Sequence, residues 1–172
     1  NARERVLQMR ILANVYVDLG DAVHALQSAN AVLDATTKGE LAGGAALARQ
    51  AHARALAIAG RADEALVEIG QVIRAFEEAR RSPDSTEVIR ARRLRTEFLL
   101  ASGCNGDALA ALRELDSRLA HGHASPIERG LTLNLLAIAE QRAGDMPAAQ
   151  AAYAAARTEL RRQLPPDHPY LT

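Results

Sequence analysis

The chain has 172 residues, 21 basic and 21 acidic side chains, and one cysteine, Cys104. Its formal net charge of zero gives no overall field that would draw in nucleic acid or an anionic membrane, so we expect neither as a partner. A single cysteine excludes an intrachain disulfide and any metal site built from several cysteines, and it favours a reducing, cytoplasmic environment. The sequence shows neither a bilayer-spanning apolar run nor a signal peptide. Because it is rich in alanine and only 3% aromatic, we expect an all-α fold.

One pattern recurs along the chain: a helix-like segment ends in a glycine, and an alanine follows five residues later. The glycines of this pattern are 40, 43 and 41 residues apart. Such a period is typical of stacked supersecondary units and predicts four helix pairs. The four occurrences are Gly20…Ala25, Gly60…Ala65, Gly103…Ala108 and Gly144…Ala149.

The first repeat is predicted over residues 3–37. Apolar residues at steps of three or four predict a helix over residues 3–19, with Val6, Met9, Leu12, Tyr16 and Leu19 on its buried face. Gly20 can adopt the left-handed conformation that ends this helix, and Asp21 can cap the next one. The buried face of that second helix is predicted to carry Ala22, Ala25, Ala29, Val32 and Leu33.

The second repeat, residues 38–82, has two possible starts. Thr37 and Glu40 have the spacing of a capping box, whereas Gly43 and Gly44 weaken any helix that runs through them. After Gly60 the pattern is regular, and one helix face carries Ala65, Ile69, Val72, Ile73 and Phe76.

The third repeat, residues 83–123, begins with capping-box spacing between Asp84 and Glu87 and turns at residues 103–106. Its helices are predicted to bury Ala91, Leu94, Phe98 and Ala101, then Ala108, Leu112, Leu115 and Leu119.

The fourth repeat, residues 124–164, has Ser125 as cap, Pro126 at the first helical position and Glu128 reaching back to the cap. Its helices are predicted to bury Leu133, Leu136 and Ala137, then Ala149, Tyr153, Ala156 and Leu160. Eight helices in four antiparallel pairs follow, as one α-solenoid domain over residues 1–172.

These positions resemble the tetratricopeptide repeat, in which the first helix carries a large apolar residue, a small one and then an aromatic. Leu12, Ala13 and Tyr16 fit that pattern, with Gly20 and Asp21 at the turn and Ala25 on the second helix. The fourth repeat matches through Leu136, Ala137, Gly144, Asp145, Ala149 and Tyr153, whereas His52 and Arg95 stand where a buried leucine is usual.

The period near 41 and the sequence of residues 164–169, Leu-Pro-Pro-Asp-His-Pro, resemble the longer repeats of the kinesin-light-chain-like subgroup. By that resemblance, residues 165–172 begin a further repeat or a cap. Bacterial relatives of this type often belong to multidomain regulators. The sequence begins at Asn1 without a methionine and already inside an amphipathic pattern, so we expect a fragment of such a protein.

The resemblance implies that the first helices of the pairs line a groove for a peptide or a partner helix. The groove positions it implies are Arg10 and Asn14, Gln50 and Arg54, Arg93 and Glu97 (or Arg92 and Thr96 in a shifted register), and Asn134 and Ile138. Arginine forks and carboxamides hold carboxylates and peptide backbone, so an acidic or carboxylate-bearing segment is the expected ligand.

Other polar clusters favour ordinary structural roles. The arginines of residues 80–95 are interrupted by acids and lack stacking aromatics, which indicates a solvated helix face and not a nucleic-acid site. His121, Gly122 and His123 offer too few ligands for a metal. His168 is expected to form a turn with Asp167.

His24 and His52 are expected to be surface or packing residues, and Cys104 an accessible thiol without a nucleophilic role. No enzyme motif and no cofactor site is visible.

Three functions compete: a protein- or peptide-binding scaffold, a self-association module, and a ligand-sensing domain of a kinase or transcription regulator.

Overall fold

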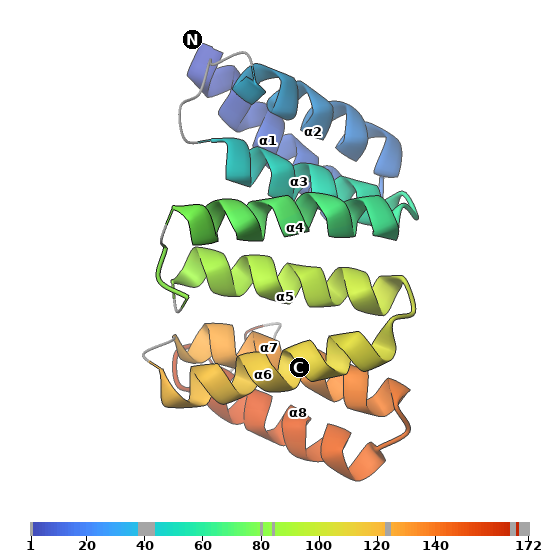
Figure 1. Cartoon of the computed structure of the whole chain (residues 1–172), viewed down its shortest axis with the longest axis vertical. Coiled ribbons are helices and arrows are strands. Elements are labelled where there is room, and N and C mark those ends of the chain that lie inside the picture. Colours follow the sequence, from blue (N-terminus) through green and yellow to red (C-terminus); the bar gives the residue numbers. More distant parts are fainter. Residues whose placement is uncertain are drawn as a thin grey trace. The chain divides into compact units, whose positions relative to one another are not determined.

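The computed structural model describes residues 2–37, 44–79, 81–83, 85–122, 125–165 and 168. These described residues form eight α-helices and no strand, as expected for an all-α fold (Figure 1). The helices are α1 (Ala2–Asp18), α2 (Ala22–Thr37), α3 (Ala45–Ile58), α4 (Ala62–Glu78), α5 (Thr86–Ala101), α6 (Asn105–His121), α7 (Pro126–Arg142) and α8 (Met146–Arg161).

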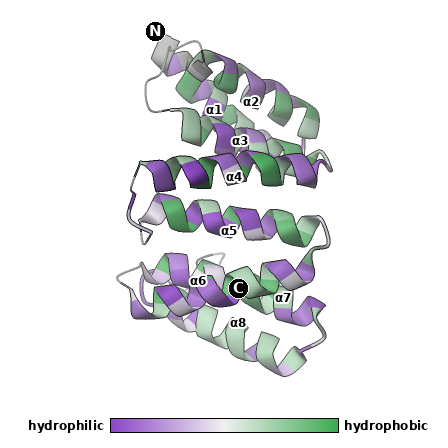
Figure 2. Ribbon diagram, in the orientation of Figure 1, coloured by the Kyte–Doolittle hydropathy of each residue, from purple (hydrophilic) through white to green (hydrophobic). Residues whose placement is uncertain are grey.

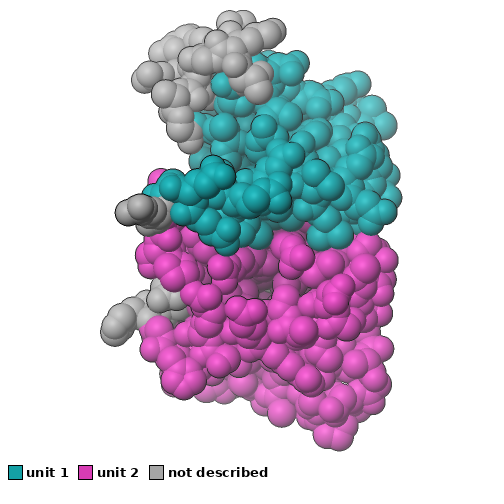
Figure 3. Space-filling view, viewed as in Figure 1, with its two compact units in different colours: residues 1–79 teal, residues 80–172 magenta. Residues whose placement is uncertain are grey.

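The helices divide into two compact units (Figure 3). Residues 1–79 contain α1 to α4, and residues 80–172 contain α5 to α8. Within the first unit α1 packs on α2 and α3 on α4, and within the second α5 packs on α6 and α7 on α8. The prediction that residues 1–172 form one domain stays a prediction.

The same turn ends the first helix of every pair. Each turn glycine has a positive φ, between 73° and 84°, which is why glycine is needed there. The residue after the glycine donates its N–H to a carbonyl five residues earlier, and the glycine donates to one three residues earlier, which is the Schellman arrangement. The bonds that span five residues run from Asp21 to Tyr16, Arg61 to Leu56, Cys104 to Leu99 and Asp145 to Glu140, at 2.9 to 3.0 Å between nitrogen and oxygen.

Side-chain caps begin three of the helices. Asp21 accepts from the backbone N–H of His24 at 3.1 Å, and Asp145 accepts from that of Ala148 at 3.0 Å. Ser125 accepts from the N–H of Ile127 at 3.2 Å, with a proline at the first helical position. The predicted caps at Asp21 and Ser125 are therefore confirmed.

Three expectations about helix ends are corrected or decided. Glu128 does not reach back to Ser125, because both of its carboxylate oxygens accept from arginines of α5. The turn predicted at residues 103–106 is shorter, since α6 already begins at Asn105. Of the two possible starts of the second repeat, α3 begins at the later one, Ala45. The predicted caps that need Glu40 and Asp84 lie outside the described residues.

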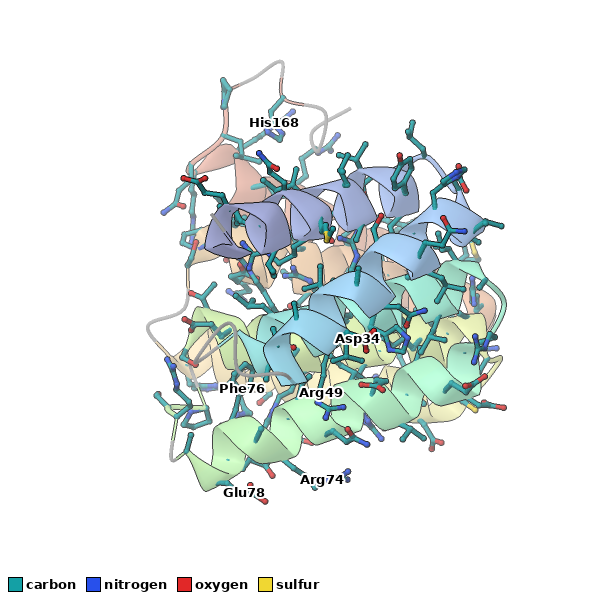
Figure 4. All side chains as sticks on the ribbon, turned by 90° about the horizontal axis from the view of Figure 1, so that it is seen from above. Asp34, Arg49, Arg74, Phe76, Glu78 and His168 are labelled. Atoms are coloured by element: carbon teal, nitrogen blue, oxygen red, sulfur yellow. The ribbon has the colours of Figure 1, made fainter. Side chains whose placement is uncertain are left out.

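The second helix of each pair buries the face that the sequence predicts. In the first unit, Ala25 and Ala29 of α2 cluster with Ala13 of α1 and Ala55 of α3, and all four are fully buried. The fully buried Ala65, Ile69 and Val72 form the same kind of face on α4. Arg49 of α3 bonds Glu68 and Gln71 of α4 at 3.1 and 2.6 Å, and Figure 4 shows its side chain directed towards α4.

In the second unit, α6 buries Ala108, Leu112, Leu115 and Leu119 as predicted. The α7–α8 pair is close-packed at Gly130, where an added Cβ would lie 2.6 Å from Cγ of Leu160. Among residues predicted to be buried, Ala101 and Tyr153 are exposed.

The helix predicted over residues 3–19 is confirmed as α1, but only part of its predicted apolar face is buried. Val6 is buried and Tyr16 is partly buried, but Met9, Leu12 and Leu19 are 36%, 46% and 74% exposed. The helix has apolar residues on two sides, and the described elements cover only the side that includes Val6 and Ala13. Periodicity reveals an apolar face but not whether another helix covers it.

Candidate functional site

The predicted groove positions lie ten and six residues before each turn glycine, on the first helix of each pair. In the first unit these helices are α1 and α3, which contact one another, and in the second they are α5 and α7, which also make contact. The fold therefore brings Arg10 and Asn14 near the α3 positions within one unit, and the α5 positions near α7 within the other.

Arg54 joins α3 to α1 in the first unit. Its guanidinium donates through Nη1 to Oδ1 of Asn14 at 2.8 Å and through Nη2 to Oδ1 of Asp18 at 2.9 Å. The Arg54 side chain is 34% exposed and that of Asp18 is 70% exposed. Two predicted groove residues are thus in direct contact. Asp18 was missed by sequence reasoning, although it lies one helical turn after Asn14.

Arg10 and Gln50 lie at the equivalent positions one turn earlier, and both are half-buried. Within the described part of the chain, no side-chain hydrogen bond or ion pair is formed by either residue. Three residues before them, Leu7 and Leu47 are 48% and 44% exposed. The A-helix surface, which we define as Leu7, Arg10, Asn14 and Asp18 of α1 with Leu47, Gln50 and Arg54 of α3, therefore combines exposed leucines with unpartnered donors.

In the second unit, the arginine at a predicted groove position, Arg93, is paired with a buried carboxylate. Arg93 donates to Oε2 of Glu128 at 2.6 Å, and Arg90 donates to Oε1 at 2.8 Å. The Arg93 and Glu128 side chains are only 14% and 4% exposed. The Arg93 guanidinium thus lies against α7 as part of the packing. Ligand binding by Arg93 would have to compete with a buried carboxylate.

The remaining predicted groove positions of this unit differ in their solvent exposure. Glu97 and Asn134 are exposed, and Ile138 is half-buried. In the alternative register, Thr96 is 2% exposed and its hydroxyl donates to the carbonyl of Arg93, so this side chain offers little surface to a ligand.

No family model and no curated protein sequence matches the chain, but solved structures do. A variant of the Podosopora anserina putative kinesin light chain nearly identical TPR-like repeats gives a TM-score of 0.75 at 18% identity, covering 99% of this chain and 82% of that one. The protein of the same description gives 0.73 at 20% identity, covering 97% and 80%. BtubC (BKLC) from P. vanneervenii gives 0.73 at 15% identity, covering 98% and 68%.

The chain has the tetratricopeptide-like repeat fold. The resemblance to the tetratricopeptide repeat drawn from the residues is therefore confirmed at the level of the fold. Stacked repeats of this kind present extended surfaces that are suited to binding other proteins.

Buried carboxylates are an unpredicted feature of this TPR-like chain. Besides Glu128, Glu140 accepts from Arg113 at 2.8 Å, and Glu159 accepts from Arg129 and Arg162, each at 2.7 Å. The pairs with Arg113 and Arg129 tie neighbouring helices of the second unit together, whereas Arg162 lies three residues after Glu159 at the end of the same helix. Since the other partners are distant in sequence, with separations of up to 38 residues, local patterns do not reveal most of them.

The histidines and the cysteine of the TPR-like chain show no catalytic arrangement among the described residues. The ring of His24 forms a hydrogen bond with the carboxylate of Asp21 and packs on the ring of Tyr16, with 5.2 Å between the ring centroids. The ring of His121 forms a hydrogen bond with the carbonyl of Ser117 in its own helix. The backbone N–H of His24, followed by its ring, lowers the pKa of Asp21 below the usual value. Cys104 is exposed, as expected.

His52 is half-buried, with its Nδ1 at 3.6 Å from Glu68. Among the described residues no three His, Cys, Asp or Glu side chains are grouped as metal ligands require. The predictions for His123 and Asp167 lie outside the described residues. The backbone N–H of His168 donates to the carbonyl of Pro165 at 3.0 Å, a bond that closes a turn.

Within the described ranges, every helix is too short or too polar to span a bilayer.

Proposed function

We propose that the chain is a non-enzymatic interaction domain of a larger regulatory protein, and that it binds an acidic peptide or partner helix along the A-helix surface. The observation that carries this proposal is the pair Arg10 and Gln50, half-buried donors without a partner among the described residues. Donors held in place by a helix but left unbonded are suited to a carboxylate or a peptide carbonyl.

Arg54 supports the same proposal. Its contact with Asp18 is an exposed ion pair, and such pairs contribute only about 0–1 kcal/mol. An incoming ligand carboxylate can therefore replace Asp18 at little cost, and the guanidinium fork can then hold it with two parallel bonds. Asp18 acts as a competitor for the ligand in this scheme.

The exposed leucines define the other half of the ligand. Leu7 and Leu47 occupy the same position on α1 and α3, three residues before the unpartnered donors. An aliphatic side chain of the ligand would bury their exposed surface, at roughly 25 cal/mol per Å². The expected ligand therefore carries an aliphatic residue followed or preceded by an acidic one.

A selection from a random peptide library tests the proposal, because it needs no named partner. We expect bound peptides to be enriched in an acidic residue near an aliphatic one. Their affinity, measured by calorimetry, should fall about tenfold or more in Arg10→Ala and Arg54→Ala, since hydrogen bonds to charged groups contribute about 1.5–3 kcal/mol. Asp18→Asn should bind more tightly because it removes the competitor.

Arg74→Ala is the matched control, because Arg74 is exposed on α4 and points away from the neighbouring helices (Figure 4). Selected peptides without acidic residues, or equal affinity in the Arg54→Ala and Arg74→Ala proteins, would contradict the proposal.

A further inference from the structure

One side of α1 is uncovered at positions where the other first helices are buried or half-buried. The positions lie twelve, nine and five residues before the turn glycine, so they share one side of a helix. On α1 they are the exposed residues Gln8, Ile11 and Val15, which we call the α1 face. Ile11 and Val15 are 53% and 43% exposed. On α3 all three are alanines that are at most 3% exposed, namely Ala48, Ala51 and Ala55.

The second unit shows the same contrast with α1. On its first helices, α5 and α7, the positions twelve and five before the turn glycine are at most 3% exposed, and those nine before it are half-buried. These residues are Ala91, Leu94 and Phe98 on α5 and Thr132, Leu135 and Ala139 on α7. Among the described helices, exposure at all three positions is therefore peculiar to α1.

The helix that covers these positions on α3 is α2, the second helix of the preceding pair. Ala55 clusters with Ala25 and Ala29 of α2, and Ala48 clusters with Val32 of the same helix. The buried residues of α2 lie on one side of the helix, and Figure 2 accordingly shows α2 as green segments alternating with purple ones. In the first unit, this side of a first helix therefore binds the second helix of the pair before it.

Val67 of α4 shows that an exposed aliphatic residue does not by itself mark such a contact. It is 60% exposed, and it lies seven residues after the turn glycine. The residues at this position in the other pairs are also exposed, namely Gln27, Ala110 and Ala151. The position of Val67 thus faces solvent in every pair, whereas the positions of the α1 face are buried or half-buried in every other pair.

The α1 face does not have the composition of a surface that ends a repeat array. Terminal pairs of such arrays carry a polar outer face, because that face must keep the array soluble. Ile11 and Val15 instead leave aliphatic surface in contact with solvent. The composition of the face therefore favours a further helix as its cover.

We propose that the α1 face receives the second helix of a further helix pair that precedes α1 in the chain, as α2 packs on α3. Ile11 and Val15 are larger than the alanines at their positions on α3, so the incoming helix must present small side chains to them. Alanine meets this need, as Ala25 and Ala29 of α2 show. Because such a helix is joined to α1 through the chain, its docking is intramolecular and does not need the roughly 800 Å² per partner of a standard interface.

An extended chain tests the proposal. Residues 1–40 are duplicated in front of residue 1, which keeps the 40-residue spacing of the first two turn glycines and places a copy of α2 before α1. Helicity measured by circular dichroism should rise by the two added helices. Val15→Glu, made only in the original α1, then reports whether the copy of α2 covers the α1 face.

We expect the effect of Val15→Glu to depend on the added pair. In the 172-residue chain Val15 is exposed, so the folding equilibrium constant from urea unfolding should change by less than about threefold. In the extended chain the substitution buries an unpaired carboxylate and should lower that constant about tenfold or more. Val67→Glu is the matched control, and it should change the constant by less than about threefold in both chains, because Val67 lies on α4 outside the α1 face.

Equal effects of Val15→Glu in the two chains would overturn the proposal, and so would an extended chain that gains no helicity. Self-association of the 172-residue chain that Val15→Glu abolishes would also overturn it, since the α1 face would then bind a second copy. The peptide selection is independent of this test, because no residue of the α1 face belongs to the A-helix surface.

Discussion

Gly130 is the position where one added methyl group should have a clear and measurable effect. A Cβ at residue 130 would lie 2.6 Å from Cγ and 2.8 Å from Cδ2 of Leu160, and 3.2 Å from the carbonyl oxygen of Ala156. Carbon atoms in contact prefer about 3.5–4.0 Å, so the Leu160 side chain would have to move by about an ångström. Leu160 is only 3% exposed, and no open solvent is available for that movement.

Two opposing terms set the size of the effect of Gly130→Ala. Replacing glycine by alanine in a helix interior favours the helix by up to about 1 kcal/mol. Overpacking a closed core costs about 1–3 kcal/mol, and the carbonyl of Ala156 is backbone that cannot rotate away. We therefore expect a net loss of about 1–2 kcal/mol in the free energy of unfolding.

Urea unfolding followed by circular dichroism measures this loss, and Gly70→Ala is the control. Gly70 lies in α4, and the nearest atom to its added Cβ would be Nη1 of Arg74 at 3.9 Å, an ordinary contact. Gly70→Ala should therefore stabilise the protein, by up to about 1 kcal/mol. If Gly130→Ala proves as stable as the wild type, the close packing of α7 on α8 at this point is refuted.

Three further outcomes follow from the contacts. Glu128→Ala should destabilise the chain by about 3 kcal/mol in urea unfolding, because it leaves the largely buried Arg93 without its partner, and a loss below about 1 kcal/mol would contradict that role. Asp145→Ala should cost about 1 kcal/mol by the same assay and Asp145→Ser much less, since serine also caps; equal losses would exclude capping as the cause. The N–H of His24 lowers the pKa of Asp21, so the Asp21 carboxylate stabilises the fold at pH values above its unfolded pKa and loses this effect as the pH falls through the lowered pKa. The difference in the free energy of unfolding between the wild type and Asp21→Asn should therefore narrow on acidification. A difference that stays constant with pH would show that ionisation of Asp21 is not involved.

Local signals predicted the turns and the second helices well. A glycine at each turn, with an alanine five residues later, is a short-range pattern, and the four positive-φ glycines bear it out. Helices such as α6 have one apolar face, so periodicity identifies the buried side without ambiguity. Helix α1 has two apolar sides, and only the position of its neighbours decides which is covered.

Non-local contacts explain what sequence reasoning missed. The spacing of Ser125 and Glu128 is that of a capping box, yet the Glu128 carboxylate bonds arginines 35 and 38 residues away. Two charge-assisted bonds in a buried site outweigh one capping bond at a helix end. Asp18 was missed because its partner is also distant: its carboxylate bonds Arg54, 36 residues away in the next helix pair.

Arg54 and Arg93 show why residue type and repeat position do not by themselves define a binding site. Both are arginines at predicted groove positions, but the first is held by an exposed carboxylate and the second by a buried one. A charge reversal at Arg93 would place two carboxylates together in a buried site, so it would report on folding and not on ligand binding. Ligand recognition by arginine should therefore be concentrated in residues 1–79, where the guanidinium groups of Arg10 and Arg54 can bind a ligand without breaking a contact of the buried core.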